Sequence, residues 1–317
     1  MNKIVFFSDW KKMYKHPTPQ CEPFVEVPFS ERESHKDADA YVQINIQHPR
    51  HVKEPFREPF YNYIADTRKP KIVFESAVFR QNVNDNFYEK YFRFGWNCFL
   101  WDKANFGPMN NGPDRWHRIQ KEHNIEIKPW RETRGQYVLI VLQHVIDTSL
   151  YQMIESYGSY YNWLYNTVSR IRSATDLPIV IRPHPKHGMY SQFFGADRIP
   201  HILDIFEDVY WSRNQGSQGL NGGKYLQRDL DDAQAVVGWT SNSLTEAVCY
   251  GVPVYAMSGG AMATPVSMND FSKIDDLHNL KHCDRQQWLN DLAYCQWTYD
   301  EIKDGTAWNH IKNVNIT

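Results

Sequence analysis

The chain of 317 residues is too long for one ordinary hydrophobic core, so its length favours two domains. Its 42% hydrophobic and 23% charged residues are typical of a globular protein, and no apolar run reaches the roughly 18 residues of a membrane span. The formal net charge of −2 gives no overall sign of nucleic-acid binding. The first 135 residues are mildly basic, with 22 Lys and Arg against 18 Asp and Glu, which is weak evidence for an anionic partner.

Apolar runs separated by polar stretches predict the elements of the first half. Strands are predicted over residues 3–8, 41–46, 71–74 and 95–101. Helices are predicted over residues 86–94 and 114–124. The stretches 16–37 and 47–60 are rich in proline and charge, so we expect them to be irregular.

The second half alternates between strands and helices more regularly. Strands are predicted over residues 136–142, 177–181, 235–237 and 254–256. Helices are predicted over residues 160–175, 225–233, 244–250 and 285–303. Because each strand is a nearly continuous apolar run, the pattern favours buried parallel sheets. The segment 126–135 resembles a linker, so the sequence predicts a two-domain α/β protein.

The stretch 235–257 combines a strand, a polar turn and a helix. Thr240, Ser241, Asn242 and Ser243 follow the strand directly. Ser and Asn are good N-cap residues, and the free N–H groups of a helix N-terminus can bind a phosphate. Ligands of doubly wound sheets bind at the carboxyl ends of strands, which is where this turn is expected. Capping alone would also explain these residues.

The run IVIRPHPK, residues 179–186, is a second polar motif at the end of a strand. Arg182, His184 and Lys186 alternate along it, and alternate residues of an extended segment point the same way. Two cations and an imidazole on one side suit a diphosphate. The alternative is a basic surface turn. Because both motifs follow strands that should be neighbours, together they favour a phosphate site.

RPHPK followed by TSNSLTEAVCYGVPVY resembles the donor-binding domain of GT-B glycosyltransferases, over about residues 136–265. Sialyl- and Kdo-transferases of capsule synthesis share an HP motif and a serine-rich motif of this type. The resemblance implies two Rossmann-like domains facing each other across a cleft. It also implies that Glu246 binds the ribose, and that no metal is needed. The donor-binding residues expected are Gln143, Arg182, His184, Lys186, Ser241, Asn242, Ser243 and Glu246.

A wider resemblance covers most of the chain. The segments that carry it are VFESAVFR (73–80), DRWHRI (114–119), KPWRETRGQYVLIVLQ (128–143) and AYCQWTYDEIKDGTAW (293–308). They look like phage-encoded glycosyltransferases, which we associate with glucosyl and arabinosyl transfer to hydroxymethylated pyrimidines of DNA. The resemblance implies hydroxymethylcytosine in DNA as the acceptor and UDP-glucose or UDP-arabinose as the donor. The nucleotide sugar is a co-substrate, and no other cofactor is expected.

The catalytic base must come from another part of the chain. An inverting transfer needs a group that takes the proton of the acceptor hydroxyl. Glu75, at the end of a predicted strand, is the first candidate, followed by Asp9 and Asp102. Since at most one is the base, the others are expected to cap or to form ion pairs. The pair Asp229 and Asp231 matches a DxD metal motif, but a solvated helix face explains it better.

Basic residues of the first half are candidates for DNA contacts. Arg57, Lys69 and Arg80 are expected to bind phosphates, with the interleaved aromatic residues Phe60 and Tyr61 available for stacking on a base. A solvated loop packed by its aromatic residues is the alternative.

The sequence therefore predicts an acceptor-binding domain over residues 1–130 and a nucleotide-sugar-binding domain over 136–285. Residues 286–317 are expected to form a helix that packs back across the cleft. Five scattered cysteines without a CxxC pair, and an N-terminal apolar segment too short for a signal peptide, favour the cytoplasm, of the host if the chain is phage-encoded. Two alternatives remain: a capsule or cell-wall glycosyltransferase that uses a CMP- or UDP-sugar, and a nucleotide-binding protein without transferase activity.

Overall fold

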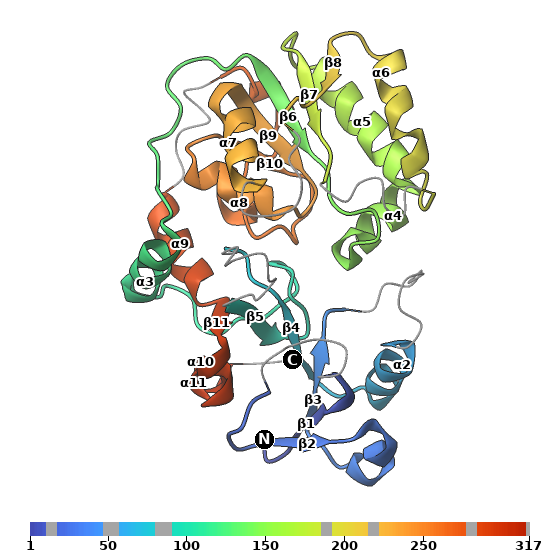
Figure 1. Cartoon of the computed structure of the whole chain (residues 1–317), viewed down its shortest axis with the longest axis vertical. Coiled ribbons are helices and arrows are strands. Elements are labelled where there is room, and N and C mark those ends of the chain that lie inside the picture. The colour runs from blue at the N-terminus through green and yellow to red at the C-terminus, as the bar shows by residue number, and fades with distance from the viewer. Residues whose placement is uncertain are drawn as a thin grey trace. The chain divides into compact units, whose positions relative to one another are not determined.

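The computed structural model describes residues 1–10, 18–46, 57–79, 91–184, 192–214, 222–276 and 284–314. The chain folds into two compact units (Figure 1). Unit 1 comprises residues 1–81, 87–123 and 289–317, and unit 2 comprises residues 82–86 and 124–288. The C-terminal residues, red in Figure 1, thus belong to the same unit as the blue N-terminal strands. No helix in the described part of the chain has both the length and the apolar character needed to cross a membrane.

Unit 2 is built on a sheet of five parallel strands in the order β10-β9-β6-β7-β8. The strands are β6 (Tyr137–Val141), β7 (Ile179–Arg182), β8 (Val209–Trp211), β9 (Ala233–Gly238) and β10 (Val254–Ala256). In chain order this is the doubly wound Rossmann arrangement, whose strand order reverses between β6 and β9. The predicted α/β class and the parallel sheet are confirmed.

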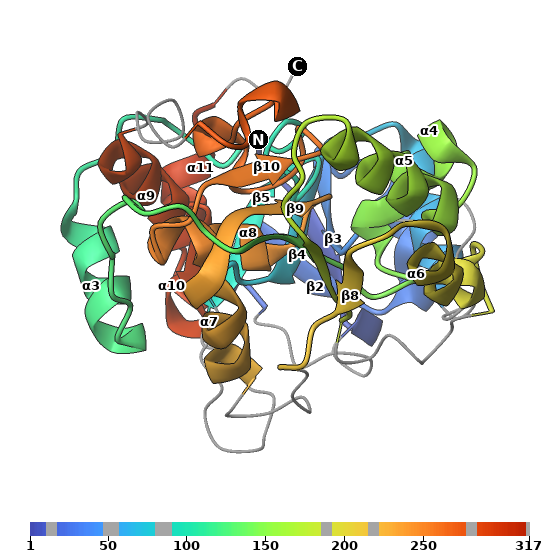
Figure 2. The same cartoon turned by 90° about the horizontal axis from the view of Figure 1, so that it is seen from above.

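Helices cover both faces of this sheet. They are α4 (Tyr151–Tyr157), α5 (Tyr160–Arg172), α6 (Ile202–Ile205), α7 (Gly222–Asp232) and α8 (Asn242–Cys249). The apolar residues of α5 pack in one core with Ile179 and Ile181 of β7. Successive strand residues point to opposite faces, and Arg182 bonds to Asp229 of α7. The helices α5 and α7 therefore lie on opposite sides of the sheet, as Figure 2 shows.

Unit 1 contains a six-stranded sheet in the order β11-β5-β4-β3-β1-β2. The strands are β1 (Ile4–Phe7), β2 (Phe24–Val27), β3 (Ala40–Ile44), β4 (Lys71–Ser76), β5 (Tyr91–Trp96) and β11 (Gln296–Thr298). The first four are mutually parallel, and their order reverses between β1 and β3. Strand β5 runs antiparallel to both of its neighbours.

Several predictions for unit 1 were wrong. Residues 91–94 form part of β5 rather than a helix, and this strand ends at Trp96 rather than at residue 101. The strand is buried along its whole length because β4 and β11 flank it, and β11 lies about 200 residues further along the chain. Strand β2 and the first three residues of helix α2 (Glu58–Thr67) occupy stretches expected to be irregular. Proline is tolerated at the start of α2 because the first helical turn leaves its N–H groups unpaired.

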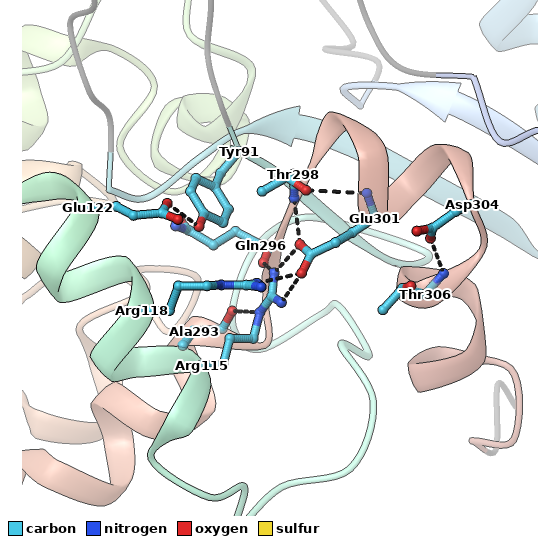
Figure 3. A network of polar contacts seen from close by, with 10 residues as sticks. All are labelled: Tyr91, Arg115, Arg118, Glu122, Ala293, Gln296, Thr298, Glu301, Asp304 and Thr306. Atoms are coloured by element: carbon cyan, nitrogen blue, oxygen red, sulfur yellow. Dashed lines mark hydrogen bonds and ion pairs between the residues drawn. The ribbon is translucent and has the colours of Figure 1, made fainter.

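The C-terminal segment is bound into unit 1 by a polar network (Figure 3). The expected single helix over 285–303 is instead α9 (Arg285–Ala293), β11 and α10 (Tyr299–Lys303), followed by α11 (Thr306–Ile311). Arg115 of α3 (Asp114–His123) donates hydrogen bonds to the backbone oxygens of Ala293 and Gln296, and to both carboxylate oxygens of Glu301. Burial alone would raise the pKa of Glu301, but Arg115, together with the N–H of Thr298 and with Arg118, lowers it to about 2.

Candidate functional site

The carboxyl ends of three neighbouring strands form one edge of the unit 2 sheet. Val141 of β6 pairs with Arg182 of β7 and with Gly238 of β9. Because the strands are parallel and in register, the residues that follow them reach the same edge. This edge contains the reversal of strand order, which is where doubly wound sheets bind their ligands.

A buried polar network joins β6 to β9 at this reversal. Gln143 accepts a hydrogen bond from the backbone N–H of Thr240 at 2.8 Å and donates to the Thr240 hydroxyl at 3.0 Å. It also donates to Ser149 at 3.0 Å, and Ser149 donates to Asp147 at 2.7 Å. The amide group of Gln143 therefore bridges two strands, and its expected contact with the donor stays a prediction. Asp147 is the N-cap of the short 3-10 turn over Thr148–Leu150, because its side chain accepts a hydrogen bond from the Ser149 N–H.

The turn after β9 leads directly into α8. Ser241 is the N-cap residue in extended conformation, and its hydroxyl accepts from the N–H of Ser243 at 3.3 Å. A Cβ atom at Gly238 would lie 2.9 Å from Cγ2 of Val141 on the neighbouring strand β6, so glycine permits the close packing at this strand end. The predicted strand, polar turn and capped helix are confirmed. Phosphate binding by Ser241, Asn242 and Ser243 stays a prediction.

Arg182 is turned away from the position that the strand alternation suggested. Its Nη1 donates to the carboxylate of Asp229 at 2.6 Å and to the backbone oxygen of Asn214 at 2.8 Å. Asp229 is only 1% exposed and also accepts from Ser212, so it does not belong to a solvated helix face as expected. Arg182 still lies within β7, where its side chain faces α7. Lys186 lies outside the described residues.

His184 lies beside a second histidine that sequence reasoning left out of the site. The ring of His184 contacts the ring of His144, with centroids 5.5 Å apart and an interplanar angle of 62°. His144 follows Gln143 at the carboxyl end of β6. The signal in the sequence was its position directly after a buried strand, the same criterion that selected Gln143.

Glu246 is exposed on α8, one turn beyond the N-cap. Its backbone oxygen accepts from the N–H of Tyr250 within the helix end. Its expected contact with a ribose stays a prediction.

Two carboxylates lie at the corresponding edge of unit 1. Asp9 follows β1 at the reversal of strand order, and its Oδ2 accepts from the N–H of Phe29 at 2.7 Å. Glu75 lies near the end of β4, and its Oε1 accepts from the N–H of Ser76 at 2.7 Å. Burial lowers the pKa of Arg57, while the charge of Glu75 raises it, so these two groups interact electrostatically. The edge thus carries the first two candidate bases.

The third candidate base, Asp102, does not follow a strand. It lies in an exposed turn after β5. Because β5 is antiparallel, its end at Trp96 pairs with Ile72, at the edge of the sheet opposite to Glu75. The expectation that Asp102 ends a strand is therefore wrong, and its catalytic role stays a prediction.

The candidate acceptor residues differ in their exposure. Arg57 precedes α2 and is 4% exposed, so it does not lie on a solvated loop. Phe60 and Tyr61 are buried in the core of unit 1, where Phe60 packs on Trp10 at 4.8 Å. Lys69 is exposed after α2. Arg80 lies outside the described residues. Among the residues described, no group of three or more His, Cys, Asp or Glu is arranged to hold a metal ion.

No protein-family model matches the chain, and no curated protein matches it. Among solved structures, it is similar to the β-Kdo 2,4 transferase of Thermosulfurimonas dismutans KpsC, with a TM-score of 0.54 and 12% identity over 92% of this chain and 90% of that chain. It is also similar to the β-Kdo 2,7 transferase of the same KpsC, with a TM-score of 0.50 and 13% identity over 98% and 99% of the two chains. At these identities the likeness shows a shared fold.

Proposed function

We propose that the protein is a glycosyltransferase that takes its sugar from a nucleotide sugar. One observation carries the proposal: at the strand reversal of unit 2, the capped N-terminus of α8 and the imidazole of His184 follow strands that end at the same edge of the sheet. N–H groups and imidazoles are hydrogen-bond donors, and a diphosphate needs donors on several oxygens. The fold shared with two sugar transferases supports the same conclusion.

The donor nucleotide is held by unit 2. In this proposal, the N–H groups of α8 with Ser241 and Ser243 bind the phosphates, His184 donates to a phosphoryl oxygen, and Glu246 accepts from the ribose hydroxyls. Charge that develops on the leaving nucleotide is stabilised by these fixed donors rather than by a metal ion. The transfer inverts the anomeric carbon because the acceptor attacks directly, without a covalent sugar–enzyme intermediate.

The base is supplied by unit 1. Glu75 is the first candidate, because its carboxyl group lies near the carboxyl end of β4, the edge at which a doubly wound sheet carries its functional groups. Asp9 is the second, because it follows β1 at the strand reversal. In either case the carboxylate takes the proton of the acceptor hydroxyl as that oxygen bonds to the anomeric carbon.

The acceptor that we favour is hydroxymethylcytosine in phage DNA, with UDP-glucose or UDP-arabinose as donor. This rests on the resemblance carried by residues 73–80, 114–119, 128–143 and 293–308. Lys69, exposed on unit 1, is available for a phosphate of the DNA backbone.

A capsule or cell-wall glycan is the second candidate acceptor. The observation in its favour is the likeness to the two Kdo transferases, which covers most of both chains. The donor would then be a CMP- or UDP-sugar. A nucleotide-binding protein without transferase activity would bind the nucleotide but transfer no sugar to either acceptor.

Mass spectrometry of DNA tests the acceptor. Hydroxymethylated DNA is incubated with the protein and with UDP-glucose, UDP-arabinose or CMP-Kdo in turn, and unmodified DNA serves as the control. The proposal expects a mass gain of one hexose or one pentose per modified cytosine, and none on unmodified DNA. No gain with any donor would overturn the DNA acceptor. Nucleotide release from CMP-Kdo in the presence of a glycan acceptor would favour the second candidate.

A further inference from the structure

His144 contacts His184, the residue to which the proposed function gives a donor phosphate. We propose that His144 is a positioning residue, whose ring holds the His184 imidazole in the orientation that binds phosphate. This inference rests on the proposed function. The inference goes beyond the proposed function because it assigns a role to His144, which lies outside both sequence motifs.

The backbone on either side of His144 is fixed by hydrogen bonds. The N–H of Gln143 donates to the hydroxyl of Tyr160 at 2.7 Å, and that hydroxyl donates to the Gln143 oxygen at 3.1 Å. Burial raises the pKa of Tyr160, so its hydroxyl remains a donor. On the other side, the N–H of Asp147 donates to the oxygen of His144 at 2.9 Å. His144 therefore projects from a stretch with little freedom to move.

The contact between the two imidazoles is one of ring packing. The centroids lie 5.5 Å apart at 62°, close to the edge-to-face geometry that aromatic rings prefer. The Nε2 atom of His144 has no solvent-exposed surface. Both histidines are half-buried, and in this proposal His184 meets the ligand at the sheet edge while His144 supports it from the side of β6.

The segment that carries His184 is also held at its start. Arg182 is anchored by Asp229, and its backbone oxygen accepts from the N–H of Leu142 at 2.9 Å. Pro183 then restricts the backbone between Arg182 and His184. With the start of the turn fixed and the ring packed against His144, the imidazole loses little conformational freedom when a phosphate binds, which favours affinity.

Two substitutions at position 144 separate ring packing from hydrogen bonding. His144→Phe keeps an aromatic ring against His184 but removes both nitrogens, and His144→Ala removes the ring. His201→Ala is the control, because His201 is an exposed histidine of the same unit. Binding of UDP, CMP, uridine and cytidine is measured by calorimetry, and thermal unfolding shows whether each variant is folded.

The proposal expects His144→Ala to weaken nucleotide binding about tenfold, and His144→Phe to stay within about twofold of the unsubstituted protein. Nucleosides, which carry no phosphate, should bind all variants alike. Equal weakening by Phe and Ala, or no weakening by Ala, would overturn the positioning role while leaving the proposed function intact. If the unsubstituted protein binds neither UDP nor CMP, the proposed function fails and this role fails with it.

Discussion

The two sheets of the molecule both reverse their strand order, but their carboxyl edges present opposite chemistry. At the edge of unit 2, hydrogen-bond donors gather: the first turn of α8 and the imidazole of His184, against which His144 packs. At the edge of unit 1, acceptors gather: the carboxylates of Asp9 and Glu75. Donors suit the anionic leaving group of a nucleotide sugar, and carboxylates suit the removal of a proton from an acceptor hydroxyl.

The support behind each edge differs as well. Unit 2 uses a neutral network between Gln143, Ser149 and Thr240, and it neutralises its buried cation Arg182 with Asp229. In unit 1 each carboxylate accepts a backbone N–H, and the buried charge network around Arg115 joins α3 to the C-terminal segment instead. We therefore expect mutations at the unit 2 edge to affect nucleotide binding and mutations at the unit 1 edge to affect catalysis. Mutations in the buried networks should affect stability.

The largest effect is expected at the unit 1 edge, from Glu75→Gln. Loss of the base should lower kcat for transfer by about 10²–10⁴-fold, since that is the usual contribution of general base catalysis. Nucleotide affinity, assigned to unit 2, should not change. Steady-state kinetics with calorimetry separates the two. Asp9→Asn is the matched variant, with an expected loss of kcat below about tenfold. The reverse order of effects would assign the base to Asp9.

The next effect concerns the buried charge pair of unit 2. Asp229→Ala leaves the Arg182 guanidinium buried without its carboxylate, which should lower the free energy of unfolding by about 3–5 kcal/mol. Asp231→Asn is the control on the exposed side of the same helix, with an expected change within about 0.5 kcal/mol. Urea unfolding followed by tryptophan fluorescence measures both. A different result would indicate that Asp229 and Asp231 bind a metal ion: both substitutions would abolish transfer, and the activity of the unsubstituted protein would depend on added divalent cations.

The difference between Arg182 and Ser241 also shows which features the sequence reveals. The turn at Ser241 was predicted correctly because its signals are local: an apolar strand, a glycine at its end, and a capping side chain two residues from the N–H it binds. The orientation of Arg182 depends on Asp229, which lies 47 residues further along the chain. Alternation along a strand predicts the face of the sheet on which a side chain lies, but it does not predict which residues of the covering helix will bind that side chain.

The same contrast explains the errors in unit 1. The strands β1, β3 and β4 are apolar runs, and the pattern alone predicted them. Strand β5 carries Arg93 at its centre, whose guanidinium donates to the backbone oxygens of Ser76 and Phe99. Its pairing with β11 joins residues about 200 positions apart, so no local pattern indicates it. The His144–His184 contact escaped prediction for the same reason, since it needs β6 and β7 to be neighbours.

The stability of unit 1 at low pH tests the buried charge of Glu301. The pKa of Glu301 falls from 4.5 to about 2 on folding, so the ionised carboxylate contributes about 3 kcal/mol of stability above pH 4.5. That contribution is lost as the pH falls towards 2. Glu301→Gln imitates the protonated form, so it should be about 3 kcal/mol less stable at pH 7, with the gap narrowed by about half near pH 3. Urea unfolding measures this difference in the free energy of unfolding between the two proteins, and a difference that does not change with pH would contradict the prediction. Asp300→Asn, at an exposed neighbouring residue, is the control.

The smallest effect is expected within the neutral network of unit 2. Thr240→Val keeps the shape of the side chain but removes the hydroxyl that bonds to Gln143 and Ser149, which should lower the free energy of unfolding by about 1–3 kcal/mol. Thr240→Ser keeps the hydroxyl and should lose less. Because this network joins β6 to β9 at the strand reversal, Thr240→Val should also weaken UDP binding, whereas Glu75→Gln should not. Unchanged UDP affinity in a folded Thr240→Val variant would mean that the donor does not depend on this edge.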